Sequence, residues 1–204
     1  MELYEALSQI SEIRARIART ETFRGYRSLT VGFSGSLGIA AGIVQAIHLP
    51  SPEQQISAYL ALWISVAAIS LAVVSVELAI RCYFAVSPRT IRLTILAAEQ
   101  FLPCVVVGAT LTAILACVAP ESLWILPGLW ATVFSLGVFA SCRLLPRPMF
   151  WVGVFYLGAG ATCLAMGNGP HALSPWMMAG TFGTGQLLTA ASLYWTLERK
   201  HEQF

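Results

Sequence analysis

Two glutamates on either side of a charged turn are the residues of this chain best placed to do chemistry. Glu77 and Arg81 precede a turn at Ser87, and Arg92 and Glu99 follow it. If the chain folds back at Ser87, the two arginines lie at matching positions on the two arms and the glutamates lie deeper. Carboxylates held at one depth of a membrane can bind or transfer a proton or a cation.

Glu99 is the more unusual of the two carboxylates, because the sequence becomes fully apolar about six residues before it. At a helical rise of 1.5 Å per residue, Glu99 then lies about 9 Å inside the hydrocarbon. Gln100 adds a polar group beside it, and Pro103 leaves one backbone carbonyl without its helical partner. Two interpretations stay open, which are a proton or cation site and a buried glutamate satisfied by a neighbouring arginine or hydroxyl.

Other catalytic or metal-binding patterns are weak. His48 and His171 fall in turns on one side of the predicted bundle without a third ligand. The five cysteines form no CxxC or Cys-His cluster and are interpreted as small packing residues. We expect no metal, no cofactor and no catalytic residue. A lipid-modifying enzyme is left open only by the charged group at the turn, which comprises Glu77, Arg81, Arg89, Arg92 and Glu99.

The composition predicts an all-α, polytopic membrane protein. Hydrophobic residues make up 57% of the chain and charged residues only 11%, which is too apolar for a soluble domain of this size. Aspartate is absent, Lys200 is the single lysine, and the formal net charge is +2. The sequence therefore offers no basic surface for nucleic acid.

Periodicity and hydropathy divide the chain into three parts. Residues 1–28 are predicted to form a cytoplasmic amphipathic helix and a basic collar, and residues 198–204 a cytoplasmic tail. The amphipathic helix is expected to bind the membrane surface or a partner, or to lie against its own bundle. Between these parts, six transmembrane helices are predicted, at about 29–49, 56–80, 93–118, 123–142, 149–167 and 174–197.

The distribution of charge predicts the orientation of these helices. All 12 basic residues fall on one side of the six spans, whereas the opposite turns carry only Glu53 and Glu121. Cytoplasmic loops are enriched in Lys and Arg, so both termini are expected in the cytoplasm of a bacterial-type cell membrane. Tyr59 and Trp63 are expected to anchor the second span at the outer interface.

Small and polar residues predict where helices pack. Ser34, Gly38, Gly42 and Ala46 recur every fourth residue, a pattern that lets another helix approach closely, in the same bundle or in a dimer. Gln186 lies near mid-membrane in the glycine-rich sixth span, where it is expected to line a polar path or to bond to a neighbouring helix.

Two functions are compatible with these features. The first is movement of a proton, ion or small solute, with Glu99 as the binding or titrating group, Gln100, Gln186 and Glu77 assisting, and Arg81 and Arg92 as supporting charges. The alternative is a non-catalytic membrane subunit or scaffold, which assembles with itself or with another membrane protein through its small-residue helix faces and N-terminal helix.

Overall fold

The computed structural model describes residues 28–84, 88–142, 144–169 and 171–198 of the chain. These residues form helices joined by short turns, with no strand among them. The all-helical class predicted from composition is thus confirmed for the described part. The predicted amphipathic helix and most of the basic collar and tail lie outside the described residues.

Helices follow the predicted spans closely. In chain order they are α2 (Ser28–His48), α3 (Ile56–Tyr83), α4 (Pro88–Val118), the 3₁₀ turn η1 (Pro120–Ile125), α5 (Leu126–Ser141) and α6 (Met149–Ala165). Four more segments then follow one another without a break: α7 (Pro175–Met178), the π-helical η2 (Ala179–Gly183), α8 (Thr184–Leu193) and the π-helical η3 (Tyr194–Glu198). We call these four the last helix.

Four of the described helices are long and apolar enough to cross a membrane, which supports an integral membrane protein. They are α2, α3 over Ile56–Ile80, α4 over Ala98–Val118, and η1 with α5 over Pro120–Ser141. The apolar helix α6 is shorter, and the last helix contains two π-helical segments. Spans five and six, and the inward orientation of both termini, stay predictions.

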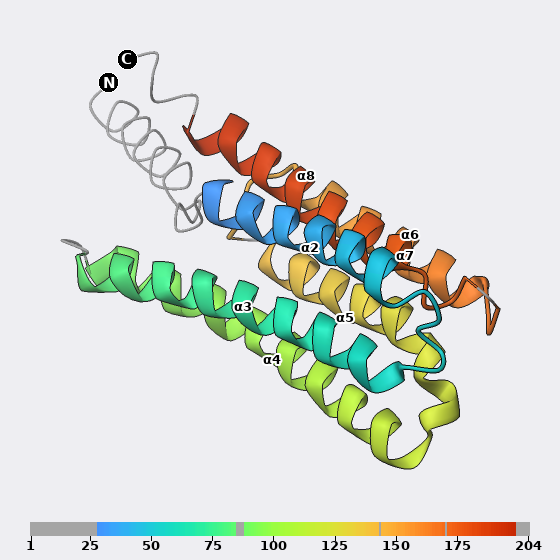
Figure 1. The fold of residues 1–204 in the computed structure, drawn as a ribbon. Helices are drawn as coiled ribbons and strands as arrows, with labels where there is room; N and C mark the ends of the chain where they lie inside the picture. The colour runs from blue at the N-terminus through green and yellow to red at the C-terminus, as the bar shows by residue number, and fades with distance from the viewer. Residues whose placement is uncertain (1–27, 85–87, 143, 170, 199–204) are drawn as a thin grey trace, which may run out of the picture.

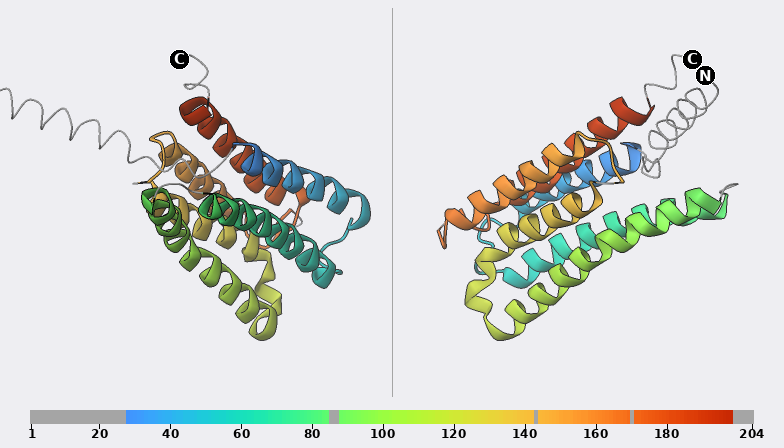
Figure 2. Two further views of the ribbon diagram at one scale, coloured as in Figure 1. Left: turned by 90° about the vertical axis from the view of Figure 1, so that its left-hand side faces the viewer. Right: turned by 180° about the vertical axis from the view of Figure 1, so that it is seen from behind.

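The helices form an elongated bundle in which segments distant in sequence lie side by side. α2 lies along the last helix, α5 packs between α6 and α4, and α3 packs on α2 (Figures 1 and 2). α3 and α4 form a hairpin, and its closed end extends beyond the nearby ends of α2 and α5 (Figure 1). This hairpin carries the charged turn predicted to be functional.

Glycine contacts hold α2 against the last helix. A Cβ atom built on Gly42 would lie 2.5 Å from the Cβ of Ala179, and one on Gly35 would lie 3.0 Å from the carbonyl oxygen of Gly183. Gly38 faces the backbone of Gly183 in the same way. The two backbones therefore touch, as small-residue helix faces allow in membranes.

Most of the predicted four-residue repeat lies in this contact. Ser34, Gly38 and Gly42 are buried, whereas Ala46 is exposed beyond the end of the contact. The hydroxyl of Ser34 donates a hydrogen bond to the carbonyl oxygen of Thr30 in its own helix, at 3.3 Å. The repeat thus packs inside one chain in this structure.

Exposed aromatic side chains gather at one end of the bundle. Tyr83 and Phe84 end the α3 arm of the hairpin, Trp151 lies in the first turn of α6, and Trp195 lies near the end of the last helix, all with more than half of the side chain exposed. These helix ends lie on the same side of the molecule (Figure 2). Trp176, in the first turn of the last helix, is 63% exposed at the opposite end, and aromatic residues are typical of both ends of a membrane-spanning bundle.

The expected interfacial anchor of the second span is wrong. Tyr59 is fully buried and Trp63 is only 3% exposed, and both belong to a core cluster with Ala41 and Leu173. The sequence placed them near a helix end, where tyrosine and tryptophan commonly meet the membrane surface. Here the turn after α6 and the start of the last helix cover them instead.

The glycine contact predicts the effect of adding one methyl group. Gly42→Ala should lower the free energy of unfolding by about 1 to 3 kcal/mol, because its Cβ must push two helix backbones apart. Gly158→Ala is the matched control, since nothing lies within 4 Å of a Cβ at that position of α6. It should be neutral or stabilising by up to about 1 kcal/mol, the difference in helix propensity.

Unfolding of the detergent-solubilised protein, followed by circular dichroism, measures both changes. Equal stability of the two variants would contradict the close contact between α2 and the last helix.

Candidate functional site

Glu99 lies on the outward face of α4 and does not point into the bundle. Its side chain is exposed, as are those of Arg92 and Ala98 near it on the same helix. No residue of α4 from Ala98 to Val118 is fully buried. The neighbouring Gln100 is half-buried, and its Oε1 is enclosed without a hydrogen-bond partner.

Packing places Glu99 near the level at which α5 ends. Gly137 of α5 faces Phe101 and Cys104 of α4, and α5 ends one turn later at Ser141. The depth of Glu99 in the hydrocarbon stays a prediction.

Among the described residues, no contact joins Glu99 to another charged residue of the turn. Glu77 is half-buried on α3, and Arg92 is exposed on α4. The side chains of Arg81 and Arg89 lie outside the described residues. The predicted cluster of two carboxylates and their arginines thus stays a prediction.

Aromatic rings fill the centre of the bundle. The ring of Phe134 on α5 contacts those of Phe101, Tyr156 and Phe182, with centroid separations of 5.0, 4.7 and 5.7 Å. Tyr156 is fully buried. These four rings come from α4, α5, α6 and the last helix, so aromatic contacts join all four of these helices at this point.

Gln186 lies at the helix contact and not at this aromatic centre. Its side chain is half-buried, and its Cβ lies 3.1 Å from the position that a Cβ on Gly35 would take. Gln186 therefore belongs to the interface between α2 and the last helix. It is not brought close to Glu99 by any contact described in the structure.

Sequence reasoning missed one of the fully buried polar side chains of the described chain. Gln45 on α2 is fully buried. Its Nε2 donates a hydrogen bond to the carbonyl oxygen of Leu173 at 2.8 Å, and its Oε1 accepts one from the indole Nε1 of Trp63 at 2.8 Å. One amide thus connects α2, α3 and the turn before α7.

A second tryptophan makes a similar connection between α5 and α4. The Nε1 of Trp130 donates a hydrogen bond to the hydroxyl of Thr112 at 2.8 Å, and that hydroxyl donates to the carbonyl oxygen of Gly108 at 2.7 Å. A glutamine within an apolar span was the available signal for the first connection. Nothing in the sequence specifies which tryptophan meets which partner.

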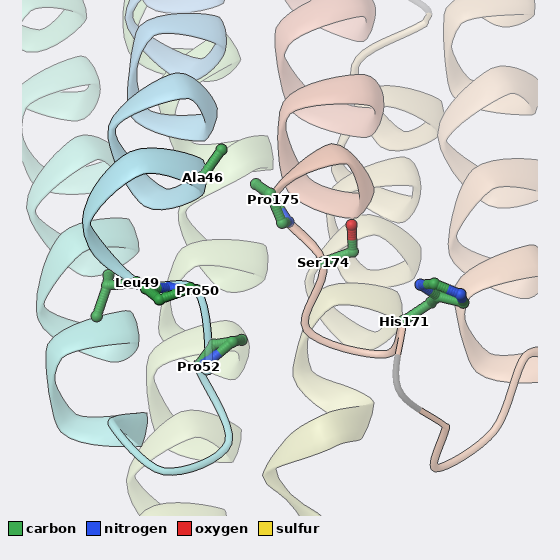
Figure 3. Close-up of a pocket in the computed structure, with 7 residues that line it drawn as sticks. All are labelled: Ala46, Leu49, Pro50, Pro52, His171, Ser174 and Pro175. Carbon is green, nitrogen blue, oxygen red and sulfur yellow. The ribbon is translucent and has the colours of Figure 1, made fainter.

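A pocket of about 350 Å³ opens at the end of the bundle opposite to Glu99. It lies between the α2–α3 turn and the α6–α7 turn (Figure 3). His171 is on its rim, while His48 is exposed but does not line it. The lining residues are Ala46, Leu49, Pro50, Pro52, His171, Ser174 and Pro175.

The exposed face of α4 forms a straight stripe that includes Glu99. At 3.6 residues per turn its members fall within an arc of about 60°, and every one of them is exposed. We call it the α4 outer stripe, and it comprises Arg92, Ile95, Glu99, Val106, Thr110, Ala113 and Cys117.

No protein family, curated protein or solved structure matches this chain. Within the described residues, no group of three or more His, Cys, Asp or Glu side chains is arranged to hold a metal ion. Only the geometry of the chain therefore bears on its function.

The buried amide of Gln45 predicts a large loss of stability on truncation. Gln45→Leu removes both hydrogen bonds and leaves the indole N–H of Trp63 and the carbonyl of Leu173 buried without partners. Each orphaned group costs about 1 to 3 kcal/mol. Thermal unfolding in detergent should show the loss, whereas Gln54→Leu, at an exposed position in the α2–α3 turn, should change stability by less than about 0.5 kcal/mol.

A double-mutant cycle isolates the bond between the two side chains. Trp63→Phe removes the donor but keeps a large ring, so Gln45→Leu should cost less in that background than in the wild type. Additive losses would show that the two side chains do not interact.

Proposed function

We propose that this chain is a non-catalytic membrane subunit that pairs with a second copy of itself through the α4 outer stripe. The observation that carries the proposal is the exposed carboxylate of Glu99 in an apolar stretch of α4 that has no fully buried residue. Ionisable side chains within membrane segments face protein or water and not lipid. A contact at this stripe gives Glu99 a protein environment.

Transport through the bundle has less support from the same geometry. Glu99 points away from the interior, and the described pocket lies at the opposite end. Aromatic rings from four helices occupy the centre. Glu99 and Gln186, which a transport path would join, lie on different helices with no described contact between them.

When two copies with the same membrane orientation form a dimer, the two-fold axis runs along the membrane normal. Each residue of the stripe then faces the same residue of the other copy. Thr110 and Ala113 are small, which lets two α4 backbones approach closely. The hydroxyl of Thr110 donates to the carbonyl oxygen of Val106 at 2.8 Å. Close approach at this level therefore buries no unpaired donor.

At the level of Glu99 such a dimer brings two carboxyl groups together. Two like charges in contact repel each other, so the charge of this side chain should control how strongly the two copies pair.

Cys117 gives a direct test of this contact. It lies eighteen residues after Glu99, which is five helical turns, and so on the same line of α4. In native membranes, a short bifunctional maleimide should give a covalent dimer of the full chain. The dimer should vanish in Cys117→Ser and persist in Cys82→Ser, which removes the half-buried cysteine of α3.

Substitutions at Glu99 then separate pairing from transport. Glu99→Gln keeps the hydrogen-bonding side chain without its charge, so the cross-linked yield should equal or exceed that of the wild type. Glu99→Lys places two like charges together, which costs several kcal/mol, and should reduce the yield at least about tenfold.

Two results would overturn the proposal. One is a monomeric mass in mild detergent together with no cross-link through Cys117. The other is a proton flux in liposomes reconstituted with the wild type that Glu99→Gln abolishes, since this would make Glu99 a transport residue.

A further inference from the structure

The closed end of the α3–α4 hairpin exposes large apolar side chains. Tyr83 is 84% exposed and Phe84 is 73% exposed, and their rings form an edge-to-face pair with centroids 5.1 Å apart. Ile80, one turn before Phe84, is 51% exposed. We call these three residues the hairpin end. After Trp63, no described side chain of α3 is fully buried, so this arm of the hairpin has an apolar surface free for another segment.

The first residues of the chain enter the structure on the same side of the bundle. α2 begins at Ser28, and the hairpin end extends past that point (Figures 1 and 2). α3 has 28 residues and α2 has 21, a difference of seven residues or about 10 Å of helix. A segment that precedes Ser28 therefore starts beside the surface that the hairpin leaves exposed.

The predicted amphipathic helix is long enough to reach this surface. Its 20 residues would be about 30 Å long as a helix. Residues 21–27 connect it to α2 and can extend over about 25 Å. The predicted helix can thus lie across the hairpin end while α2 keeps its place in the bundle.

One face of the predicted helix is apolar and needs a partner. Its members fall within an arc of about 120° with Ile10 at the centre, and a helix with such a stripe buries it against another apolar surface. They are Leu3, Ala6, Leu7, Ile10, Ile13 and Ile17.

Charge selects the hairpin over the lipid surface as that partner. The first 13 residues of the chain carry Glu2, Glu5 and Glu12 and no basic residue. At 3.6 residues per turn these three fall within an arc of about 80° beside the apolar stripe. A helix that lies on an anionic membrane surface carries lysine or arginine there instead.

The hairpin has the opposite charge at the matching place. Between residues 81 and 92 the sequence carries three arginines and no acidic residue. Arg92, on the second arm, is exposed. The hairpin therefore offers an apolar surface next to a basic one, as the predicted helix offers an apolar face next to an acidic one.

We propose that residues 1–20 form a helix that docks on the hairpin end of their own chain. The apolar face around Ile10 covers Tyr83 and Phe84, and the glutamates of the first 13 residues face the arginines of the hairpin. This contact is made within one chain and does not depend on the dimer proposed above.

Cross-linking between two introduced cysteines tests the docking. The native cysteines, at 82, 104, 117, 142 and 163, are replaced by serine in the full chain, and circular dichroism checks that the protein is folded. Ala79→Cys gives an exposed thiol one turn before Tyr83 and leaves both rings in place. Its partner is Ile10→Cys, at the centre of the apolar face. In native membranes, a short bifunctional maleimide should link these two cysteines within one chain.

Ser8→Cys is the matched control for Ile10→Cys. The two positions differ by two residues and lie on opposite faces of a helix, so the yield with Ser8→Cys should be at least about fivefold lower. Trypsin cuts after the arginines that separate the two cysteines in the sequence. The N-terminal peptide therefore stays attached only in the cross-linked chain, and mass spectrometry measures its share.

Charge reversal tests the ionic part of the contact. Glu5→Arg with Glu12→Arg should lower the yield about threefold, the effect of losing two exposed ion pairs. Adding Arg89→Glu and Arg92→Glu to that variant should restore the yield, because the charges are again opposite.

Three results would overturn the proposal. Equal yields with Ile10→Cys and Ser8→Cys would show that the segment lies on lipid or in water and not on the hairpin. Links found only between two chains would place the segment on another copy. A charge reversal that the compensating pair does not rescue would show that the glutamates do not face the hairpin.

Discussion

The close contact between α2 and the last helix is the constraint on which the rest of the structure depends. Lipid is as apolar as a leucine side chain, so membrane helices gain little by burying apolar surface and associate through close packing and hydrogen bonds. Gly35, Gly38 and Gly42 let the α2 backbone reach that of Gly183 and Ala179. Only at this separation does Gln45, one turn further on, reach the carbonyl of Leu173.

Tryptophan side chains extend the same principle to the outer helices. Trp63 connects α3 to α2 through Gln45, and Trp130 connects α5 to α4 through Thr112. Each polar group is satisfied by its neighbour, so these contacts need no water. With the aromatic rings around Phe134, they give a packed interior, which is the property expected of a subunit more than of a conduit.

Helix positions were predictable from the sequence, but helix rotation was not. Hydropathy gave spans that agree with α2, α3 and α4 to within a few residues, apart from the charged first turns of α4. Apolar side chains surround each of these helices, and they do not mark an inward face because lipid and core are both apolar. Whether Glu99 faces in or out, and whether Tyr59 and Trp63 meet lipid or protein, depends on neighbouring helices that hydropathy does not reveal.

The length of α4 shows why the level of Glu99 matters. A helix of 31 residues is about 46 Å long, whereas the hydrocarbon is about 30 Å thick. Such a helix must tilt or extend beyond the membrane. The α3–α4 hairpin extends past α2 and α5 (Figure 1), and α5 ends one turn beyond the contact of Gly137 with Phe101 and Cys104. Glu99 therefore lies near the level at which α5 ends on α4, with its side chain exposed. A carboxylate at that position gains from a protein neighbour, and the second copy that we propose provides one.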